Sequence, residues 1–323
     1  MSLAFEPLPL GPITLKNRIV LPPMQQYQGS SEGYATQYHV QHYARRARGG
    51  VGLIIIESTA VSPEGRLMAD DIGLFSDDHI APLADIARAV SAEGVPALLQ
   101  LSHGGRKSRP HGEGRLLAPS AIAYNESYGT PEMMAKQDIA SLISAFVQAA
   151  HRSVMAGFAG VELHAAHGYL LHQFLSPLSN HRKDAYGGSA ENRRRLLAEI
   201  ITEVRAALGP SKLLTMRVSA SDYDPRGLTP EHVANDLRVL APLGLDAVHI
   251  SSGGLLPIRP SDVSPGYQVG FAEIVRRAVA VPVIAVGMIR TREQIEAILA
   301  QGQADLVAIG RPLLIYPDLQ RVL

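Results

Sequence analysis

Two imidazoles and one phenol lie within six residues of one another, at His164, His167 and Tyr169. They end or follow the apolar run Gly160–His164, which predicts a buried strand. Imidazole N–H groups can hold a substrate oxygen by hydrogen bonds, and a phenol can deliver a proton to a reacting atom. If the strand belongs to a parallel barrel, the three groups lie at its C-terminal end, where barrel enzymes keep their catalytic residues.

Further side chains suited to ligand binding stand at or just after the ends of other predicted strands. They are Pro22, Pro23, Met24, Gln25 and Tyr27 after the first strand, Ser58 after the second, Gln100 in the third, Arg217 in the fifth, Gly287 and Met288 after the seventh, and Gly310 and Arg311 after the eighth. Glycines after strands seven and eight let backbone N–H groups approach a phosphate. The pattern predicts a phosphorylated cofactor across the barrel mouth, with Arg217 able to stabilise negative charge on it.

Each of these features has a plainer interpretation. The His-x-x-His spacing of His164 and His167 is compatible with a metal pair, but no third ligand has an obvious spacing, and we predict no metal. A single buried histidine is more often a core residue, whereas two with a tyrosine at a strand end favour a function. Gly287 and Gly310 could be turn glycines, and Arg217 could pair with Glu162 or Asp222. His103, Arg106 and Lys107 could equally be lid residues with no chemical role.

Short apolar runs alternate with longer amphipathic stretches along the chain. The predicted strands are 18–21, 52–57, 97–101, 160–164, 213–218, 247–251, 283–286 and 306–309, and the predicted helices are 38–48, 80–93, 138–156, 190–208, 231–241, 271–279 and 292–301. Apolar strands alternating with helices indicate a parallel sheet buried on both faces. Eight units predict an α/β fold of the (β/α)8 TIM-barrel type. An open doubly wound sheet is the alternative, but no G-x-G-x-x-G motif accompanies it.

Several connections have signals of their own. Residues 5–17 carry three prolines and a glycine and predict an N-terminal hairpin that closes the bottom of the barrel. Ser189 and Thr229-Pro230 predict helix starts by their capping chemistry. The connections 102–137, after strand three, and 253–268, after strand six, are long enough to be lids or binding loops. We expect one domain over residues 1–323.

The composition excludes several classes of protein. The chain has 323 residues and a formal net charge of zero. It has no basic patch that would bind nucleic acid or an acidic membrane. The one tight basic run, Arg193–Arg195, is expected to be a solvated helix face. The absence of cysteine excludes disulfides, thiolate nucleophiles and cysteine-ligated clusters. Without an evident signal peptide or a membrane-spanning run, a cytoplasmic protein is expected.

The chain resembles the Old Yellow Enzyme family of FMN-dependent ene-reductases, and most closely its short bacterial, thermophilic-like subgroup. The resemblance covers nearly the whole length. It rests on the runs Leu15–Val20, Pro23–Tyr27, Gln100–Lys107, His164–Asn180, Asp184–Arg193 and Ile309–Pro312.

The resemblance implies roles for these residues. FMN would lie across the barrel mouth, with Pro22–Gln25, Ser58 and Gln100 along its ring, Arg217 near the N1–O2 edge, and Gly287, Met288, Gly310 and Arg311 at its phosphate. NADPH or NADH would reduce FMN, and hydride would then pass from N5 to the C=C bond of an α,β-unsaturated carbonyl or nitro compound in the same pocket. His164 and His167 would bind the substrate oxygen, Tyr27 would line the pocket, and Tyr169 would protonate the α carbon. A homo-oligomer, dimer or tetramer, is expected.

The chain departs from the family pattern at two places. Gln25 replaces the cysteine or threonine that tunes the flavin potential. Relatives continue beyond the position of Leu323 and place an arginine in a neighbour's active site, and residues 1–323 provide no support for that feature.

Other activities remain as alternatives. A barrel lyase or isomerase with a phosphorylated substrate would need a lysine or carboxylate base, and none of the five lysines ends a strand. A redox-sensing flavoprotein without turnover is a further alternative, left open by Gln25. A dienoyl-CoA reductase type is disfavoured because cluster cysteines and a nucleotide-binding domain are missing.

Overall fold

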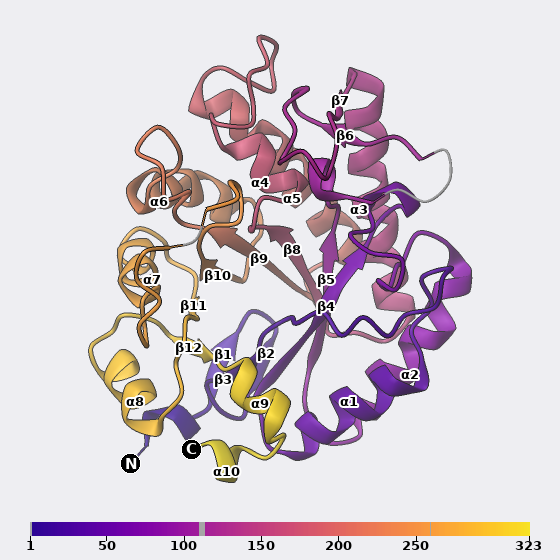
Figure 1. The fold of residues 1–323 in the computed structure, drawn as a ribbon. Helices are drawn as coiled ribbons and strands as arrows, with labels where there is room; N and C mark the ends of the chain where they lie inside the picture. The colour runs from indigo at the N-terminus through magenta and orange to yellow at the C-terminus, as the bar shows by residue number, and fades with distance from the viewer. Residues whose placement is uncertain (1, 110–113, 259) are drawn as a thin grey trace.

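Eight parallel strands close into a barrel, in the computed structural model that describes residues 2–109, 114–258 and 260–323 (Figure 1). In order around the barrel they are β3 (Ile19–Leu21), β4 (Leu53–Ala60), β5 (Ala97–Ser102), β8 (Gly160–Ala165), β9 (Leu213–Ser219), β10 (Ala247–Ser251), β11 (Val283–Ala285) and β12 (Leu306–Ala308). Strand β12 pairs with β3, which closes the ring. The predicted (β/α)8 barrel is confirmed, and every predicted strand is present with small shifts at its ends.

The strands read as continuous apolar runs because both of their faces are buried. In β4, for example, Leu53 and Ile55 face the inside of the barrel, where they pack with Leu98 and Leu213. The alternate residue Ile54 belongs to the larger core between the strands and the helices. Successive side chains of a strand point to opposite faces, and here they pack into two separate cores.

The N-terminal hairpin closes the barrel from below, as predicted. Strands β1 (Leu8–Leu10) and β2 (Ile13–Leu15) pair antiparallel, and Leu10 and Leu15 join the core inside the barrel. Figure 1 shows the hairpin across the middle of the ring of strands. The hairpin therefore leaves open the opposite end of the barrel, where the strands finish.

Helices surround the strands. They are α1 (Gln37–Arg48), α2 (Ile80–Ser91), α3 (Lys136–Met155), α4 (Leu170–Leu175), α5 (Ala190–Leu208), α6 (Pro230–Leu240), α7 (Val269–Arg276), α8 (Arg292–Ala300), α9 (Arg311–Ile315) and α10 (Leu319–Val322). The predicted caps are confirmed: the hydroxyl of Ser189 accepts from the N–H of Asn192, and that of Thr229 accepts from the N–H of His232. The sequence did not predict α4, which begins directly after Tyr169, or the short helices α9 and α10.

The basic run at the start of α5 is not the solvated face that was expected. Arg193 donates to the carbonyl of Leu175, and Arg194 forms an ion pair with Asp236 on α6. Arg195 donates to the carbonyl of Ala185. These arginines are partly buried and tie α5 to its neighbours, because an arginine fork can satisfy carbonyl groups that would otherwise lack partners.

The two long connections cover the C-terminal end of the barrel. The first contains the short strands β6 (Leu117–Ala118) and β7 (Glu132–Met133), which pair parallel, so part of it is ordered secondary structure. Its Arg106 donates to the carbonyl of Leu255 in the second connection, at 2.7 Å, and thereby joins the two. Residues 110–113 and 259 of the predicted loops lie outside the described residues.

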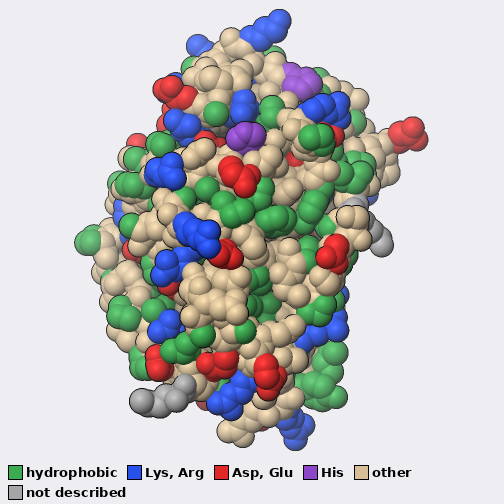
Figure 2. Space-filling view, turned by 90° about the vertical axis from the view of Figure 1, so that its left-hand side faces the viewer, with side chains coloured by type: hydrophobic (Ala, Val, Ile, Leu, Met, Phe, Trp, Pro, Cys, Tyr) green, Lys and Arg blue, Asp and Glu red, His purple; other side chains and the backbone are tan. Residues whose placement is uncertain are grey.

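Basic and acidic side chains are interspersed on the face drawn in Figure 2, as the zero net charge suggests. Among the helices of the described residues, none is at once long and apolar enough to cross a membrane.

Candidate active site

Two adjoining cavities occupy the barrel mouth. The first, of about 340 Å³, lies over β4, β5 and β8, and the second, of about 440 Å³, lies over β10, β11 and β12. Pro23, His167 and Arg217 line both. The two cavities are therefore arms of one elongated site, which suits a ligand with a phosphate at one end and a reactive group at the other.

Every residue predicted for the site lines one of these cavities. The first contains Pro23, Gln25, Tyr27, Ser58, Gln100, His164, His167, Tyr169 and Arg217. The second contains Pro22, Pro23, Met24, His167, Arg217, Gly287, Met288, Gly310 and Arg311. The topology of the barrel brings them together because parallel strands finish at the same end.

The second arm has the features of a phosphate cradle. A Cβ at Gly310 would lie 3.1 Å from the sulfur of Met24 and 3.5 Å from Pro22, so a side chain there would crowd the cavity wall. Gly287 has a φ of +126°, which a residue with a side chain rarely adopts. The guanidinium of Arg311 contacts the sulfur of Met288, a weak acceptor that leaves it able to bind a phosphate.

Arg217, where the two arms meet, is suited to an anionic ring system. It is 8% exposed, and its Nε has no hydrogen-bond partner within the described part of the chain. It forms no ion pair with Glu162 or Asp222. Burial lowers the pKa of Arg217, and the nearby carboxylate of Glu162 offsets part of that effect. A buried cation with a free donor favours a ligand that carries or develops negative charge. Together with the cradle, it fits a bound FMN.

Gln100 is oriented by a buried carboxylate beneath the site. Its Nε2 donates to Glu162 at 2.8 Å, and the second oxygen of Glu162 lies 3.1 Å from Nδ1 of His249. Because the amide nitrogen is held by Glu162, the amide oxygen of Gln100 is the end available to the cavity. It can accept a hydrogen bond from a ring N–H group of a ligand.

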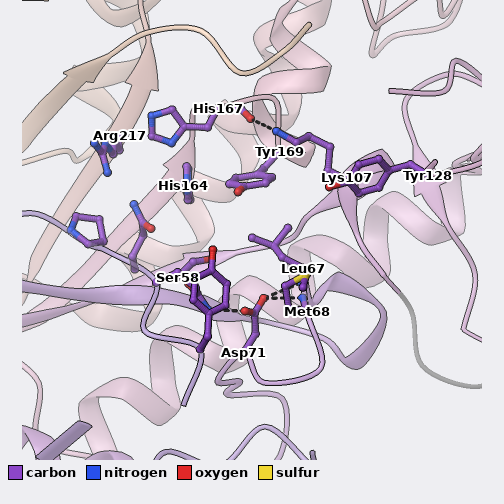
Figure 3. Close-up of a pocket in the computed structure, with 14 residues that line it drawn as sticks. Ser58, Leu67, Met68, Asp71, Lys107, Tyr128, His164, His167, Tyr169 and Arg217 are labelled. Carbon is purple, nitrogen blue, oxygen red and sulfur yellow. Dashed lines mark hydrogen bonds between the residues drawn. The ribbon is translucent and has the colours of Figure 1, made fainter. Parts of the chain in front are cut away.

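The side chains of His164, His167 and Tyr169 form a tight aromatic group in the first cavity (Figure 3). The ring of His164 lies edge-on to both others, with centroid distances of 5.2 Å to His167 and 4.8 Å to Tyr169. Nδ1 of His164 accepts from the N–H of Ala166, so its proton resides on Nε2. His164 therefore has one ring N–H to offer a ligand.

His167 is held by a different set of contacts. Its Nε2 lies 2.8 Å from the hydroxyl of Ser251, and its backbone N–H donates to the hydroxyl of Ser219 at 2.9 Å. Among the described residues its Nδ1 has no hydrogen-bond partner, so this nitrogen is the one open to a ligand. The two imidazoles are thus not equivalent, which the sequence did not predict.

The electrostatics of the group favour neutral histidines and a protonated tyrosine. Burial, followed by the nearby Arg217, holds the pKa of both His164 and His167 well below the ordinary value. Burial and, next, the carboxylate of Asp71 raise the pKa of Tyr169 above its ordinary range. At neutral pH the site therefore contains uncharged imidazole donors and a phenol that still carries its proton.

Asp71 was not predicted as a site residue. It lies on the connection after β4, where its carboxylate accepts from the backbone N–H groups of Leu67 and Met68 and from Nε2 of Gln25. Burial raises the pKa of Asp71 to about 6. The carboxylate thus fixes the amide of Gln25, but no motif in the sequence marks it.

Lys107 also enters the first cavity, although it lies five residues beyond the end of β5. The sequence alone does not assign it a role. Its ammonium is held by two backbone carbonyls, which distinguishes it from a free amine that could form a Schiff base. Within the described residues, no group of three or more His, Asp or Glu side chains is placed to hold a metal.

Within residues 2–109, 114–258 and 260–323, four residues other than glycine adopt a left-handed backbone, with φ between +56° and +57°: Tyr27, His167, Tyr223 and Met288. Three of the four line the cavities, and Tyr223 bonds to Ser252 in the wall of the second. Such conformations are costly for residues with a Cβ and concentrate at functional sites.

Comparison with known proteins gives a consistent result. Residues 3–323 match the NADH:flavin oxidoreductase / NADH oxidase family. The chain is 47% identical over 318 residues to an NADPH dehydrogenase of Geobacillus thermodenitrificans, covering 98% of this chain and 92% of that protein.

Solved structures with the same fold support this match. The structure of an old yellow enzyme homologue from Zymomonas mobilis superposes with a TM-score of 0.87 at 29% identity, over 99% of this chain and 92% of that one. That of 2-naphthoyl-CoA reductase gives a TM-score of 0.94 at 25% identity over 99% of this chain, which spans about half (51%) of the length of that protein.

Proposed function

The chain belongs to the NADH:flavin oxidoreductase / NADH oxidase family, the Old Yellow Enzyme family, and from this membership we propose that it reduces the C=C bond of α,β-unsaturated carbonyl or nitro compounds. Its class is established: it is an oxidoreductase that uses FMN as cofactor and NAD(P)H as electron donor. The substrates, the roles of individual residues, a single FMN-binding domain over residues 1–323 and a homo-oligomeric state are parts of the proposal.

The observation that carries the proposal is the convergence of His164, His167 and Tyr169 on a cavity that continues, past Arg217, into the glycine cradle. Pro22–Gln25, Ser58 and Gln100 would line the ring of FMN, and Gly287, Met288, Gly310 and Arg311 would hold its phosphate. When bound, the cofactor would supply hydride transfer from NAD(P)H to the substrate, in the cavity that the histidines and the tyrosine line.

The side chains provide binding, charge stabilisation and a proton. His164 and His167 hold the carbonyl or nitro oxygen through neutral N–H donors and stabilise the negative charge that develops on it, as an oxyanion hole does. Tyr169 gives its phenol proton to the α carbon, while hydride arrives at the β carbon. Tyr27, at the rim and 53% exposed, contacts the outer part of the substrate.

One experiment tests the proposed activity. FMN-loaded protein is reduced with NADPH under anaerobic conditions and mixed with a cyclohexenone-type enone or a nitroalkene. We expect the flavin absorbance to return and the saturated product to form in equal amount. Return of absorbance only after oxygen is admitted, with no saturated product from either compound, would overturn the proposal in favour of a redox-sensing flavoprotein.

A further inference from the structure

Lys107 occupies a position that links three connections at the barrel mouth. It lies in the short 3-10 helix Gly105–Lys107, and its Nζ donates to the carbonyls of His167, at 2.9 Å, and Gly254, at 3.1 Å. Figure 3 shows the ammonium directed at the His167 carbonyl, beside the ring of Tyr169. The turn that carries the proton donor is therefore fastened by this lysine.

The two turns that Lys107 binds are packed backbone to backbone. A Cβ at Gly168 would lie 2.2 Å from the carbonyl oxygen of Gly254, and a Cβ at Gly254 would lie 2.6 Å from the carbonyl oxygen of His167. Both glycines have positive φ, at +74° and +86°. The carbonyls of His167 and Gly254 thus converge on one point, and their dipoles make a binding place for a cation there.

The same ammonium lies over two aromatic rings. Nζ is 4.9 Å from the ring centroid of Tyr169 and 4.6 Å from that of Tyr124. A cation over a ring face attracts its π electrons, and the attraction grows when the ring gains negative charge. Tyr169 gains that charge when its phenol loses a proton.

We propose that Lys107 is a positioning residue for Tyr169: it fixes the turn from His167 to Tyr169 and, by its charge over the ring, favours loss of the phenol proton. This inference rests on the proposed function, since it concerns the proton that Tyr169 donates. Oη–H of Tyr169 breaks as a C–H bond forms at the α carbon, hydride derived from NAD(P)H completes the β carbon, and solvent returns a proton to the phenolate.

The need for such a cation follows from the surroundings of Tyr169. Burial and the carboxylate of Asp71 raise the pKa of the phenol, which makes it a weaker acid. A positive charge at the ring opposes both effects. Tyr169 also affects the pKa of Arg217, but of the cations in the described part of the chain it is Lys107 that lies over the ring face.

The charge of Lys107 itself depends on pH. Burial, followed by the neighbouring Arg106, lowers the pKa of Lys107 to about 8. Among the described residues, the titratable and charged groups near it are Arg106, Tyr124, Tyr128, His164, His167 and Tyr169 (Figure 3). The lysine is charged at neutral pH and loses its charge as the pH rises through about 8, so its effect on Tyr169 is lost in that direction.

The test compares Lys107→Met, which keeps the apolar stem, with Lys107→Arg, which keeps the charge. Stopped-flow absorbance of FMN-loaded protein gives the rate of flavin reduction by NADPH and the rates of reoxidation by an enone and by a nitroalkene. For Lys107→Met at pH 7 we expect enone reoxidation to slow about tenfold, as for one unit in the acidity of the donor. Flavin reduction and nitroalkene reoxidation should change by less than about twofold, since a nitronate product is stable without protonation.

The pH profile and a double mutant separate this role from a structural one. Wild-type enone reoxidation should fall above about pH 8, whereas Lys107→Arg should keep its rate there. In a Tyr169→Phe background, Lys107→Met should have no further effect. Equal slowing of all three reactions, or full slowing in the Tyr169→Phe background, would overturn the inference.

Two outcomes need their own control. If Lys107→Met does not retain FMN, the pH profiles of the wild type and of Lys107→Arg decide. A rate of enone reoxidation that falls above about pH 8 in both proteins would overturn the inference. If the wild type reduces neither enone nor nitroalkene, the proposed function fails, which is a different result from failure of the Lys107 role.

Discussion

Gln25 donates from its amide nitrogen to the carboxylate of Asp71, and its amide oxygen is buried with no hydrogen-bond partner in the described part of the chain. The nitrogen is therefore not directed at a ligand in the cavity. At the position of the cysteine or threonine in the family pattern, the amide nitrogen, which is the only donor atom of this side chain, is directed at a carboxylate. We therefore expect Gln25 to contribute little hydrogen bonding to the edge of the bound flavin ring.

We predict that Gln25→Cys raises the midpoint potential of bound FMN. A thiol would offer a small donor to the O4–N5 edge, where reduced flavin carries more negative charge. One hydrogen bond to a charged group contributes about 1.5–3 kcal/mol, which corresponds to roughly 30–60 mV for two electrons. Spectroelectrochemical titration measures the shift, and the rate of flavin reduction should change more than the affinity for enones.

Gln25→Met is the matched control, because it keeps the length of the side chain without its amide. Its potential should stay near that of the wild type. A lower potential in the cysteine variant would show that the glutamine is already the better donor.

Replacement of Arg311 should show how much the phosphate contributes to cofactor affinity, as distinct from the ring. We expect Arg311→Gln to weaken FMN binding by about 10- to 100-fold, for the loss of one charged hydrogen bond. Riboflavin, which lacks the phosphate, should bind both forms equally well. Fluorescence titration of the apoprotein measures both, and an equal loss for riboflavin would place Arg311 outside the phosphate site.

Tyr169→Phe should slow enone reduction while leaving flavin reduction by NAD(P)H largely intact, because protonation belongs only to the second half-reaction. General acids contribute roughly 10²–10⁴-fold, and we expect a loss within that range. The loss should be smaller for a nitroalkene. Stopped-flow measurement of both half-reactions checks this, and equal losses in the two would contradict a role as proton donor.

The neutral histidines predict how phenols bind. A bound phenolate resembles the charged enolate, so His164→Ala and His167→Ala should each weaken it by about 10- to 100-fold, measured by its charge-transfer absorbance with the flavin. If the variants instead lose a stoichiometric zinc ion present in the wild type, the histidines are metal ligands.

The same titration has a definite pH dependence. The pKa of each histidine is held well below its ordinary value, so neither gains a proton as the pH falls from 8 to the ordinary histidine value of about 6.5. The affinity of the wild type should then follow the ionisation of the phenol, apart from any step near pH 6 that comes from Asp71 in the wall of the same cavity. Two phenols of different acidity should give midpoints that move with the ligand, and a common midpoint near 6.5, the ordinary pKa of histidine, that persists in Asp71→Asn would show that the imidazoles titrate.

The barrel could be predicted because each strand is an apolar run buried on both faces, such as Leu53–Ala60 in β4. Helix α4 was not predicted because its six residues are all buried and show no amphipathic period. Strands β6 and β7 have two residues each, and Glu132–Met133 is exposed, so no hydrophobic signal marks them.

The site was predictable where residues follow directly from strand ends, and less so where a loop folds back. Asp71 reaches Gln25 only because the connection after β4 is held over the mouth, with Arg66 donating to the carbonyls of Ser30, Ser31 and Asp71. The contacts with Ser30 and Ser31 span about 35 residues of sequence. Hydrophobic period and residue spacing do not record such contacts. For the same reason, the contacts of Lys107 with the carbonyls of His167 and Gly254 were not predicted from the sequence.

The left-handed residues at the mouth carry a consequence for engineering. Glycine would relieve the backbone at Tyr27, His167 and Met288, each of which has a φ near +57°. The relief amounts to about 1 kcal/mol per residue. A selection for thermostability alone would therefore tend to enrich glycine at the very positions that shape the site. Heat-resistant variants obtained in this way would be poor enzymes, and a screen on this protein should score turnover alongside melting temperature.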